Sequence, residues 1–214
     1  MVNLLEEVAL LAYRDDNGRN IAPYLHLSLA GAALLELTLS DHIQIDESGR
    51  VDVVKQIPSG HAALDVVCKR VTESRIRHII SSWVQILSGV DLRTAVLEGL
   101  VDQRVLTHNS DRVLGFIPVN RYLPTEAGVE SEIRGRLERA FGHSAGADVR
   151  TAALAGIVGT TFMERAALPQ HKFGEVTKVF KELGQRDPLA KKVMDGLQLA
   201  VSVARSGSGS AVVG

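Results

Sequence analysis

The sequence predicts a mainly α protein: a buried central helical bundle surrounded by amphipathic helices, with two short β-hairpins. Three observations support this fold class. Apolar residues make up 45% of the 214-residue chain but aromatic residues only 4%, so the core must be built from Leu, Val, Ile and Ala, a mixture that favours helices. The stretch 25–39 is almost continuously apolar, and strand-like alternation is confined to two short segments near residues 43–53 and 107–124.

The central helix is predicted over residues 22–40. Its four polar residues, His26, Ser28, Glu36 and Thr38, scatter around the helical wheel and leave no polar face, which is typical of a helix buried on all sides. The apolar run covers about 15 residues and contains Glu36, whereas a membrane span needs roughly 20 apolar residues. We therefore expect a core helix and not a membrane anchor.

The elements around this helix follow from local patterns. A short helix over 4–13 ends at the polar cluster "RDDNGR". Alternation at residues 43–45 and 51–53, with a turn at Ser48-Gly49, predicts the first hairpin. Ser59 is the predicted N-cap of the next helix. A further helix runs from about residue 74 to Gly89, and another starts at about residue 91.

The second half of the chain begins with the second hairpin, whose predicted tip is the polar run Asn109, Ser110 and Asp111. An amphipathic helix over 126–141 and a single apolar helix over 150–168 follow, and then two helices near 174–183 and 187–204. We expect one domain over residues 1–204 and a flexible Gly/Ser-rich tail over 205–214.

Charge and cysteine content narrow the function classes. The formal net charge is −1 and the pI near 6.7, so any anion site must be local, because no overall basic field attracts nucleic acid or anionic lipid. The single cysteine, Cys68, excludes an internal disulfide framework and indicates a reducing, cytoplasmic compartment. The first residues, "MVNLLEEVALLAY", lack the basic start of a signal peptide.

Patterns for catalysis and metal binding are weak. The 7 histidines never occur at the i, i+3 or i+4 spacing that places two metal ligands on one helix face. The phosphate loop, GxGxxG and GxSxG motifs are missing from the sequence. Ser59 and His61 lie close in sequence, as do His143 and Ser144, but such pairs often arise by chance. We expect a non-enzymatic protein without metal or cofactor.

A nucleic-acid-binding function is an alternative, because the helix near 92–104 followed by a hairpin is the way winged-helix domains end. A recognition helix needs several basic residues to meet phosphates and base edges. This helix has two, Arg93 and Arg104, against three acids: Asp91, Glu98 and Asp102. We therefore do not expect nucleic acid among the partners.

Six segments together resemble one known family, the Golgi phosphoprotein 3 family. They are "LLEEVALLAYRDDNGR" (4–19), "SLAGAALLELTLSDHIQID" (28–46), "PSGHAALD" (58–65), "WVQILSG" (83–89), "LEGLVDQRVLT" (97–107) and "RTAALAGIVG" (150–159). They occur in the family's order and cover nearly the whole chain to about residue 204. The resemblance implies a helical domain with a central buried bundle and hairpins on one face.

The resemblance also implies a function. Characterised eukaryotic members are adaptors without enzymatic activity that bind phosphatidylinositol 4-phosphate on the cytosolic face of Golgi membranes and link glycosyltransferase tails to coatomer. Eukaryotic relatives carry a basic arm before the first motif, whereas here Met1 lies three residues before Leu4, so a coatomer role is not expected.

The family's head-group pocket carries over onto four positions. Its Trp falls at Ile21, its helix Arg at Ala30, and its two later basic residues at Val90 and Arg93. Only Arg93 keeps the family's residue type, so it is the expected head-group ligand. The other interpretation of Arg93 is a solvated residue near a helix N-terminus.

The second hairpin is the other site that the resemblance implies, since family members use it against membranes and neighbouring subunits. Its apolar residues are Val113, Leu114, Phe116 and Ile117, and the flanking Arg112 and Arg121 are expected near lipid phosphates. Alternatively, the hairpin packs only on its own core. A separate departure is Arg104, which replaces the glycine that usually ends the preceding helix and is expected to alter that turn.

These expectations combine into one hypothesis: a cytoplasmic, phosphoinositide-binding peripheral membrane adaptor. Its partners would be an acidic phospholipid head group, the membrane surface, protein clients of unknown identity and a second copy of the chain, bound through the second hairpin. The alternative is a cytoplasmic protein-interaction scaffold that binds no lipid, and the third reading is a winged-helix-like nucleic-acid binder.

Overall fold

The computed structural model describes residues 2–13, 18–55, 58–113, 117–125 and 128–208, of which 111–113, 117–120 and 207–208 by their backbone alone. The helices are α1 (Leu4–Ala12), α2 (Leu25–Leu39), α3 (Ala62–Glu73), α4 (Ile80–Ser88), α5 (Leu92–Asp102), α6 (Gly128–Gly142), the 3-10 turn η1 (Ser144–Gly146), α7 (Val149–Thr160), α8 (Glu164–Ala167), α9 (Phe173–Gly184) and α10 (Pro188–Ser208). Two antiparallel hairpins pair β1 (Ile43–Ile45) with β2 (Val51–Val53), and β3 (Leu106–Val113) with β4 (Ile117–Pro124). The mainly α prediction is confirmed.

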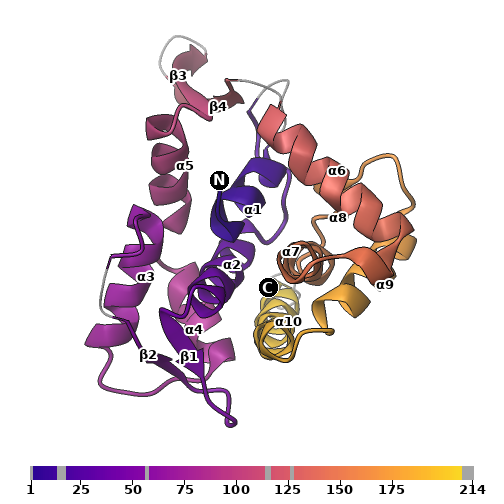
Figure 1. Cartoon of the computed structure of the whole chain (residues 1–214). Coiled ribbons are helices and arrows are strands. Elements are labelled where there is room, and N and C mark those ends of the chain that lie inside the picture. Colours follow the sequence, from indigo (N-terminus) through magenta and orange to yellow (C-terminus); the bar gives the residue numbers. More distant parts are fainter. Residues whose placement is uncertain (1, 14–17, 56–57, 114–116, 126–127, 209–214) are drawn as a thin grey trace, which may run out of the picture.

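Helix α2 forms the centre of the molecule. The helices α1, α4, α7 and α10 lie next to it, with α3 and α5 on one flank and α6 and α9 on the other (Figure 1). Almost every residue of α2 is buried, as expected from its lack of a polar face. Among the described residues, no helix is long and apolar enough to cross a membrane.

The C-terminal ends of α1 and α7 lie near the N-terminal end of α2. At the opposite end, the Leu4 N–H donates to Glu36 Oε2 at 2.7 Å and Arg150 lies 3.0 Å from the same carboxylate oxygen, so α1 and α7 both start beside the end of α2. They therefore run antiparallel to α2 and finish near its start, where the Phe162 ring lies 6.2 Å from the Tyr24 ring. One end of the bundle thus combines the N-terminus of α2 with the turns that follow α1 and α7.

Glycine allows the tightest helix crossing. A Cβ built on Gly156 of α7 would lie 2.6 Å from the Cα of Gly184 in α9. No side chain fits at that distance, so the two backbones touch directly. This crossing fixes α9, and with it Phe173 and Lys181, against the end of α7.

Three local predictions were wrong. The helix after Ser59 begins at Ala62 with His61 as N-cap residue, and Ser59 instead accepts a bond from the His61 N–H at 3.2 Å and donates to Asp65 at 2.7 Å. The helix expected from residue 74 begins only at Ile80. The apolar helix expected over 150–168 is broken between α7 and α8, where Phe162 has a left-handed backbone with φ of 60°.

The second hairpin and the chain end also differ from expectation. Asn109, Ser110 and Asp111 lie within β3, opposite residues 119–121, and are not its tip. The described pairing ends at Val113–Ile117, and residues 114–116 lie outside the described residues. Helix α10 runs to Ser208, so the first four residues of the expected tail, 205–208, are helical, and the remaining tail lies outside the described residues.

The turn after α5 keeps its shape despite Arg104. The Val105 N–H donates to the Leu100 carbonyl at 2.9 Å, the pattern of a Schellman C-cap, and Arg104 takes the left-handed position with φ of 60°. The expectation that arginine alters this turn was therefore wrong; the turn is formed with a strained residue in place of glycine.

Candidate functional site

A cleft opens between the N-terminal ends of α2 and α5, here called the α2–α5 cleft. It has a volume of about 350 Å³. One wall is the approach to α2 and its first turns, and the other is the corner between α4 and α5. The lining residues are Asn20, Ala22, Pro23, Leu25, His26, Leu29, Ser88, Gly89, Val90, Asp91, Leu92 and Arg93.

The backbone makes this cleft favourable for an anion. The first turns of two helices line it, and the free N–H groups and dipole of a helix start attract negative charge. Tyr24, the N-cap residue of α2, makes no side-chain capping bond, so the first N–H groups of α2 are not satisfied in that way. His26 is exposed in the first turn of α2 and adds a side chain that can donate to an anion.

Asp91 acts in the opposite direction. Its carboxylate caps α5 by accepting a bond from the Thr94 N–H at 3.0 Å. The bond from the Thr94 backbone, with a smaller contribution from Arg93, lowers the pKa of Asp91 below its usual value. The carboxylate is therefore ionised at neutral pH, and it reduces the affinity of the cleft for an anion.

Arg93 is held in place at the wall of the cleft. Its Nε donates to the Tyr13 hydroxyl at 2.5 Å, and its guanidinium carbon lies 5.6 Å from the centre of the Tyr13 ring. Burial raises the pKa of Tyr13, against the influence of Arg93, so Tyr13 remains a neutral phenol that accepts the bond. An arginine fixed through Nε can present the outer edge of its guanidinium group to a ligand.

The four positions suggested by the resemblance do not share one cavity. Val90 and Arg93 line the α2–α5 cleft. Ala30 is fully buried in α2, and Ile21, 42% exposed, lines a different and larger cavity. Sequence reasoning missed His26, because a lone histidine in an apolar run carries no pattern that separates a ligand from a surface residue.

A comparison with models of protein families shows to which family the chain belongs. The family model described as Golgi phosphoprotein 3 (GPP34) matches residues 4–199. The chain belongs to the Golgi phosphoprotein 3 family. The matched range runs from the start of α1 into α10 and includes the whole α2–α5 cleft.

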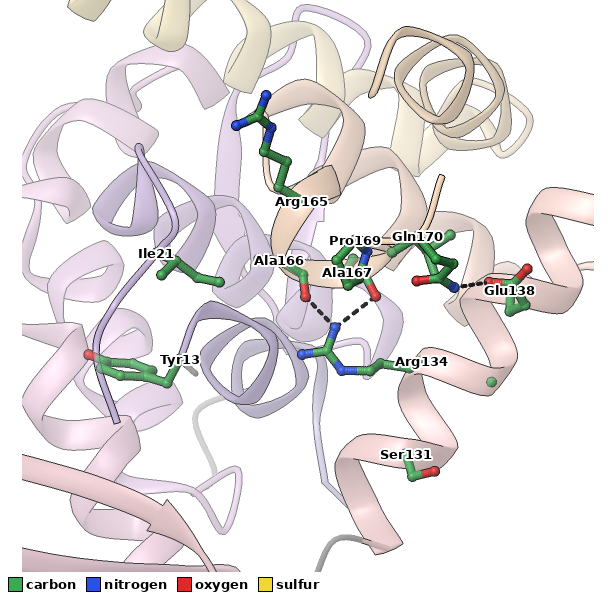
Figure 2. Close-up of a pocket in the computed structure, with 12 residues that line it drawn as sticks. Tyr13, Ile21, Ser131, Arg134, Glu138, Arg165, Ala166, Ala167, Pro169 and Gln170 are labelled. Atoms are coloured by element: carbon green, nitrogen blue, oxygen red, sulfur yellow. Dashed lines mark hydrogen bonds between the residues drawn. The ribbon is translucent and has the colours of Figure 1, made fainter. Parts of the chain in front are cut away.

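The larger cavity of this family member has a volume of about 790 Å³ and lies between α6, the turn after α8 and the segment that joins α1 to α2 (Figure 2). Arg134 donates to the carbonyls of Ala166 and Ala167 and pairs with Glu130, so its charge is already used by the protein. Figure 2 shows Arg165 pointing away from Arg134. This cavity therefore offers a large, partly apolar hollow beside Ile21 and no concentrated positive charge.

The base of the second hairpin packs against Tyr13, the hydrogen-bond partner of Arg93. The Tyr122 ring stacks on His108 at 4.8 Å and meets the Tyr13 ring at 6.4 Å. Tyr13 thus connects the hairpin to Arg93. The base of the hairpin is consistent with the reading that it packs on its own core.

The candidate membrane residues of this hairpin stay a prediction. Arg121 is half-buried and lies opposite Asn109 in the strand register. The side chains of Arg112, Val113 and Ile117 are not described, and Leu114 and Phe116 lie outside the described residues.

The Ser59–His61 pair considered for catalysis has structural partners. The Ser59 hydroxyl donates to Asp65, while His61 Nδ1 lies 3.2 Å from the buried carboxylate of Glu6. Ser59 and His61 are therefore each bound to a different acid and do not form a nucleophile–base arrangement. Within the described part of the chain, no group of three or more His, Cys, Asp or Glu side chains could hold a metal ion.

Proposed function

We propose that this Golgi phosphoprotein 3 family member is a non-enzymatic peripheral membrane adaptor that binds an anionic phospholipid head group, of the phosphoinositide class, in the α2–α5 cleft. Family membership supports the adaptor role. The observation that carries the lipid role is Arg93, fixed by Tyr13 at the wall of a cleft lined by two helix N-termini.

The chemistry of a phosphorylated head group matches these groups. A phosphomonoester carries more than one negative charge near neutral pH, and the guanidinium group of Arg93 can bind two of its oxygens. The first turn of α2, which has no side-chain cap, and the His26 side chain supply further donors. A cleft of about 350 Å³ lies within the range of small-molecule sites.

The residues that replace the family's pocket residues determine how strongly we expect the cleft to bind a head group. Ile21 and Ala30 supply neither the aromatic ring nor the second cation of the family's pocket, and Asp91 adds negative charge. We expect weak binding that depends on an anionic membrane as a whole, as when a single head-group contact is combined with a charged surface. The protein would then associate reversibly with the cytosolic face of a membrane.

Co-sedimentation with vesicles tests the proposal. The vesicles contain phosphatidylcholine alone, with phosphatidylserine, or with phosphatidylinositol 4-phosphate, each at low and high salt. We expect the protein to pellet with the phosphoinositide vesicles at low salt, and Arg93→Ala to weaken this binding several-fold. Arg139→Ala, which removes an exposed arginine of α6, is the matched control and should bind like the wild type.

Two results would contradict the proposal. A protein that stays in the supernatant under every condition has no lipid function. Phosphoinositide binding that is unchanged in Arg93→Ala removes Arg93 from the site. Circular dichroism of each variant establishes that it is folded.

A protein-interaction scaffold without lipid binding is the second candidate, and the cavity beside Ile21 favours it. This cavity, of about 790 Å³, is lined in part by Tyr13, Ile21, Leu168 and Pro169, which suit an apolar side chain of a client protein. Sedimentation that fails with all vesicles, together with a complex that Ile21→Asp abolishes, would favour this reading. A mobility shift with duplex DNA at low salt would instead favour the nucleic-acid reading.

A further inference from the structure

We propose that an aromatic and basic cluster centred on Phe162 is a second membrane contact, which rests on the bilayer interface beside the α2–α5 cleft. This inference rests on the proposed function and adds a surface to it. The cluster consists of Tyr24, Phe162, Phe173, Lys181 and Arg205, which come from the start of α2, the α7–α8 turn, α9 and α10.

Phe162 is the common contact of the cluster. Its ring stacks on Phe173 at 6.3 Å and lies 6.2 Å from Tyr24. The Lys181 ammonium lies 5.5 Å and the Arg205 guanidinium carbon 5.2 Å from the centre of the ring. Four elements, from the start of α2 to the end of α10, thus bring aromatic rings and two cations to one place.

Part of the aromatic surface of the cluster is exposed to solvent. Phe173, the first residue of α9, is 40% exposed although it is among the largest apolar side chains of the protein. Phe162 is half-buried, so part of the stacked pair faces water. Exposed aromatic side chains of this kind are typical of protein or membrane contacts.

The charge of the cluster is positive. Among the described residues, neither Lys181 nor Arg205 forms a salt bridge, although both lie against the same ring. The nearby carboxylate of Glu164 is buried and accepts a hydrogen bond from the Thr177 hydroxyl at 2.6 Å. Arg205 is exposed and Lys181 is half-buried, with Lys181 also attracting the Glu164 carboxylate, so Arg205 is the more available of the two cations to negatively charged groups outside the protein.

The backbone at Phe162 is unusual in a way that points to function. Phe162 follows the C-cap of α7, and the Met163 N–H donates to the Val158 carbonyl at 3.0 Å, which makes this turn a Schellman motif. The left-handed position in such a turn is usually glycine, but here Phe162 occupies it with φ of 60°. Such strained positions are frequent at functional sites, and this one places an aromatic ring at the centre of the cluster.

The cluster and the cleft lie at the same end of α2. Tyr24 caps α2 and contacts Phe162, while its neighbours Pro23, Leu25 and His26 line the cleft. A head group bound by Arg93 therefore holds this end of the bundle toward the membrane. The cluster would then meet the interface of the same bilayer.

An anionic bilayer is the partner that matches both properties. Aromatic rings favour the head-group level of a membrane, and exposed Lys and Arg are attracted to the negative potential of the cytosolic leaflet. An acidic protein could pair with the two cations, but it would also need an apolar surface shaped to fit the aromatic rings. We therefore commit to the bilayer and treat an acidic polypeptide as an outcome of the test.

A tryptophan reporter tests the inference directly. The native Trp83 is 2% exposed and should not respond to vesicles, so Phe173→Trp adds a single responsive fluorophore. Val149→Trp is the matched control, because Val149 is 49% exposed and starts α7 at the opposite end of the bundle. With phosphatidylserine and phosphoinositide vesicles, we expect a blue shift and quenching by brominated lipids for Phe173→Trp only.

A charge variant supplies the second measurement. Lys181→Gln should weaken binding to phosphatidylserine vesicles that lack phosphoinositide about fivefold, since one basic residue near an anionic surface contributes about that factor. Arg93→Ala should instead remove mainly the additional binding caused by the phosphoinositide. The two variants thus separate the cluster from the cleft.

The outcomes are distinct. Vesicles that pellet Phe173→Trp without changing its emission overturn the cluster but leave the proposed function intact. Failure of the wild type and all variants to pellet overturns both. An emission change caused by soluble polyglutamate and not by vesicles assigns the cluster to an acidic polypeptide, and overturns the membrane contact.

Discussion

Asp91 and Arg93 lie two residues apart at the start of α5, and they have opposite effects on an anion in the α2–α5 cleft. Asp91→Asn should keep the cap of α5, because asparagine is an equally good N-cap residue. It should also strengthen binding to anionic vesicles by roughly two- to fivefold, the effect of removing one exposed like charge. Vesicle co-sedimentation at low salt measures this change.

The capping role of Asp91 provides the control. Asp91→Ala removes both the charge and the cap, so it should strengthen lipid binding similarly but lower the free energy of unfolding by about 1 kcal/mol. Weaker or unchanged lipid binding in both variants would show that the cleft does not attract an anion.

Glu164 gives a pH dependence that can be assigned to one residue. Burial raises the pKa of Glu164 above 4.5, and its Oε2 has no hydrogen-bond partner among the described residues. Because the folded protein holds this proton more tightly than the unfolded chain, ionisation of Glu164 reduces stability as the pH rises from about 4.5 through the raised pKa.

Glu164→Gln removes this effect. We expect the variant to be more stable than the wild type at pH 7, by an amount on the order of 1 kcal/mol. The difference should disappear below about pH 4.5, where Glu164 is protonated in both states. Urea unfolding at the two pH values measures it, and a variant that is less stable at pH 7 would contradict the assignment.

At the scale of single elements, the C-terminus of α5 stores strain at a defined position. Arg104 is exposed and adopts the left-handed conformation in the Schellman turn. Arg104→Gly should therefore raise the free energy of unfolding by about 1 kcal/mol, because glycine takes this conformation without steric strain. Thermal denaturation should show a Tm increase of roughly 2–4 °C.

A glycine in the interior of the same helix should have the opposite effect. Glu98→Gly, at an exposed position of α5, should lower stability by about 1 kcal/mol. If Arg104→Gly were also destabilising, the turn would not be strained by its arginine.

Helix positions could be predicted from the sequence wherever the apolar pattern alone decides them. α2 is the clearest case, because no arrangement other than full burial satisfies a helix without a polar face. The break at Phe162 could not be predicted, since glycine or asparagine normally marks a left-handed turn and neither is present there. For the same reason the turn at Arg104 was expected to change, although backbone bonding preserves it.

The candidate site was only partly predictable. The family resemblance placed Val90 and Arg93 in one cleft, but it could not show that Ile21 faces another cavity. The partnership of Arg93 with Tyr13 joins residues 80 positions apart in the sequence, and no local pattern encodes such a contact. The Phe162 cluster was missed for the same reason, because four elements contribute to it.

At the scale of the whole molecule, a buried ionic network joins the end of the bundle opposite the cleft. Arg150 of α7 lies 3.0 Å from Glu36 of α2 and 3.5 Å from Glu7 of α1, and Arg136 of α6 also pairs with Glu7. Burial raises the pKa of Glu7, while Arg136 and Arg150 lower it. Four helices are thus held together by charges that are largely removed from water.

Arg150→Ala tests how far this network stabilises the fold. The substitution leaves Glu36 without its ion-pair partner and Glu7 with only one cation. The free energy of unfolding at pH 7 should therefore fall by about 2–3 kcal/mol. This is less than the usual cost of breaking a buried ion pair, because Arg150 is partly exposed. Arg139→Ala, an exposed arginine on α6, should change stability by less than about 0.5 kcal/mol.

The loss in Arg150→Ala should also depend on pH. Loss of Arg150 raises the pKa of Glu7 further, so the penalty is complete only while the carboxylate is ionised. As the pH falls through this raised value toward 4.5, Glu7 becomes neutral in both proteins and the difference between them should shrink. Urea denaturation of both proteins from pH 7 to pH 4 measures this convergence, and a constant difference would mean that Arg150 stabilises the bundle by packing and not by charge.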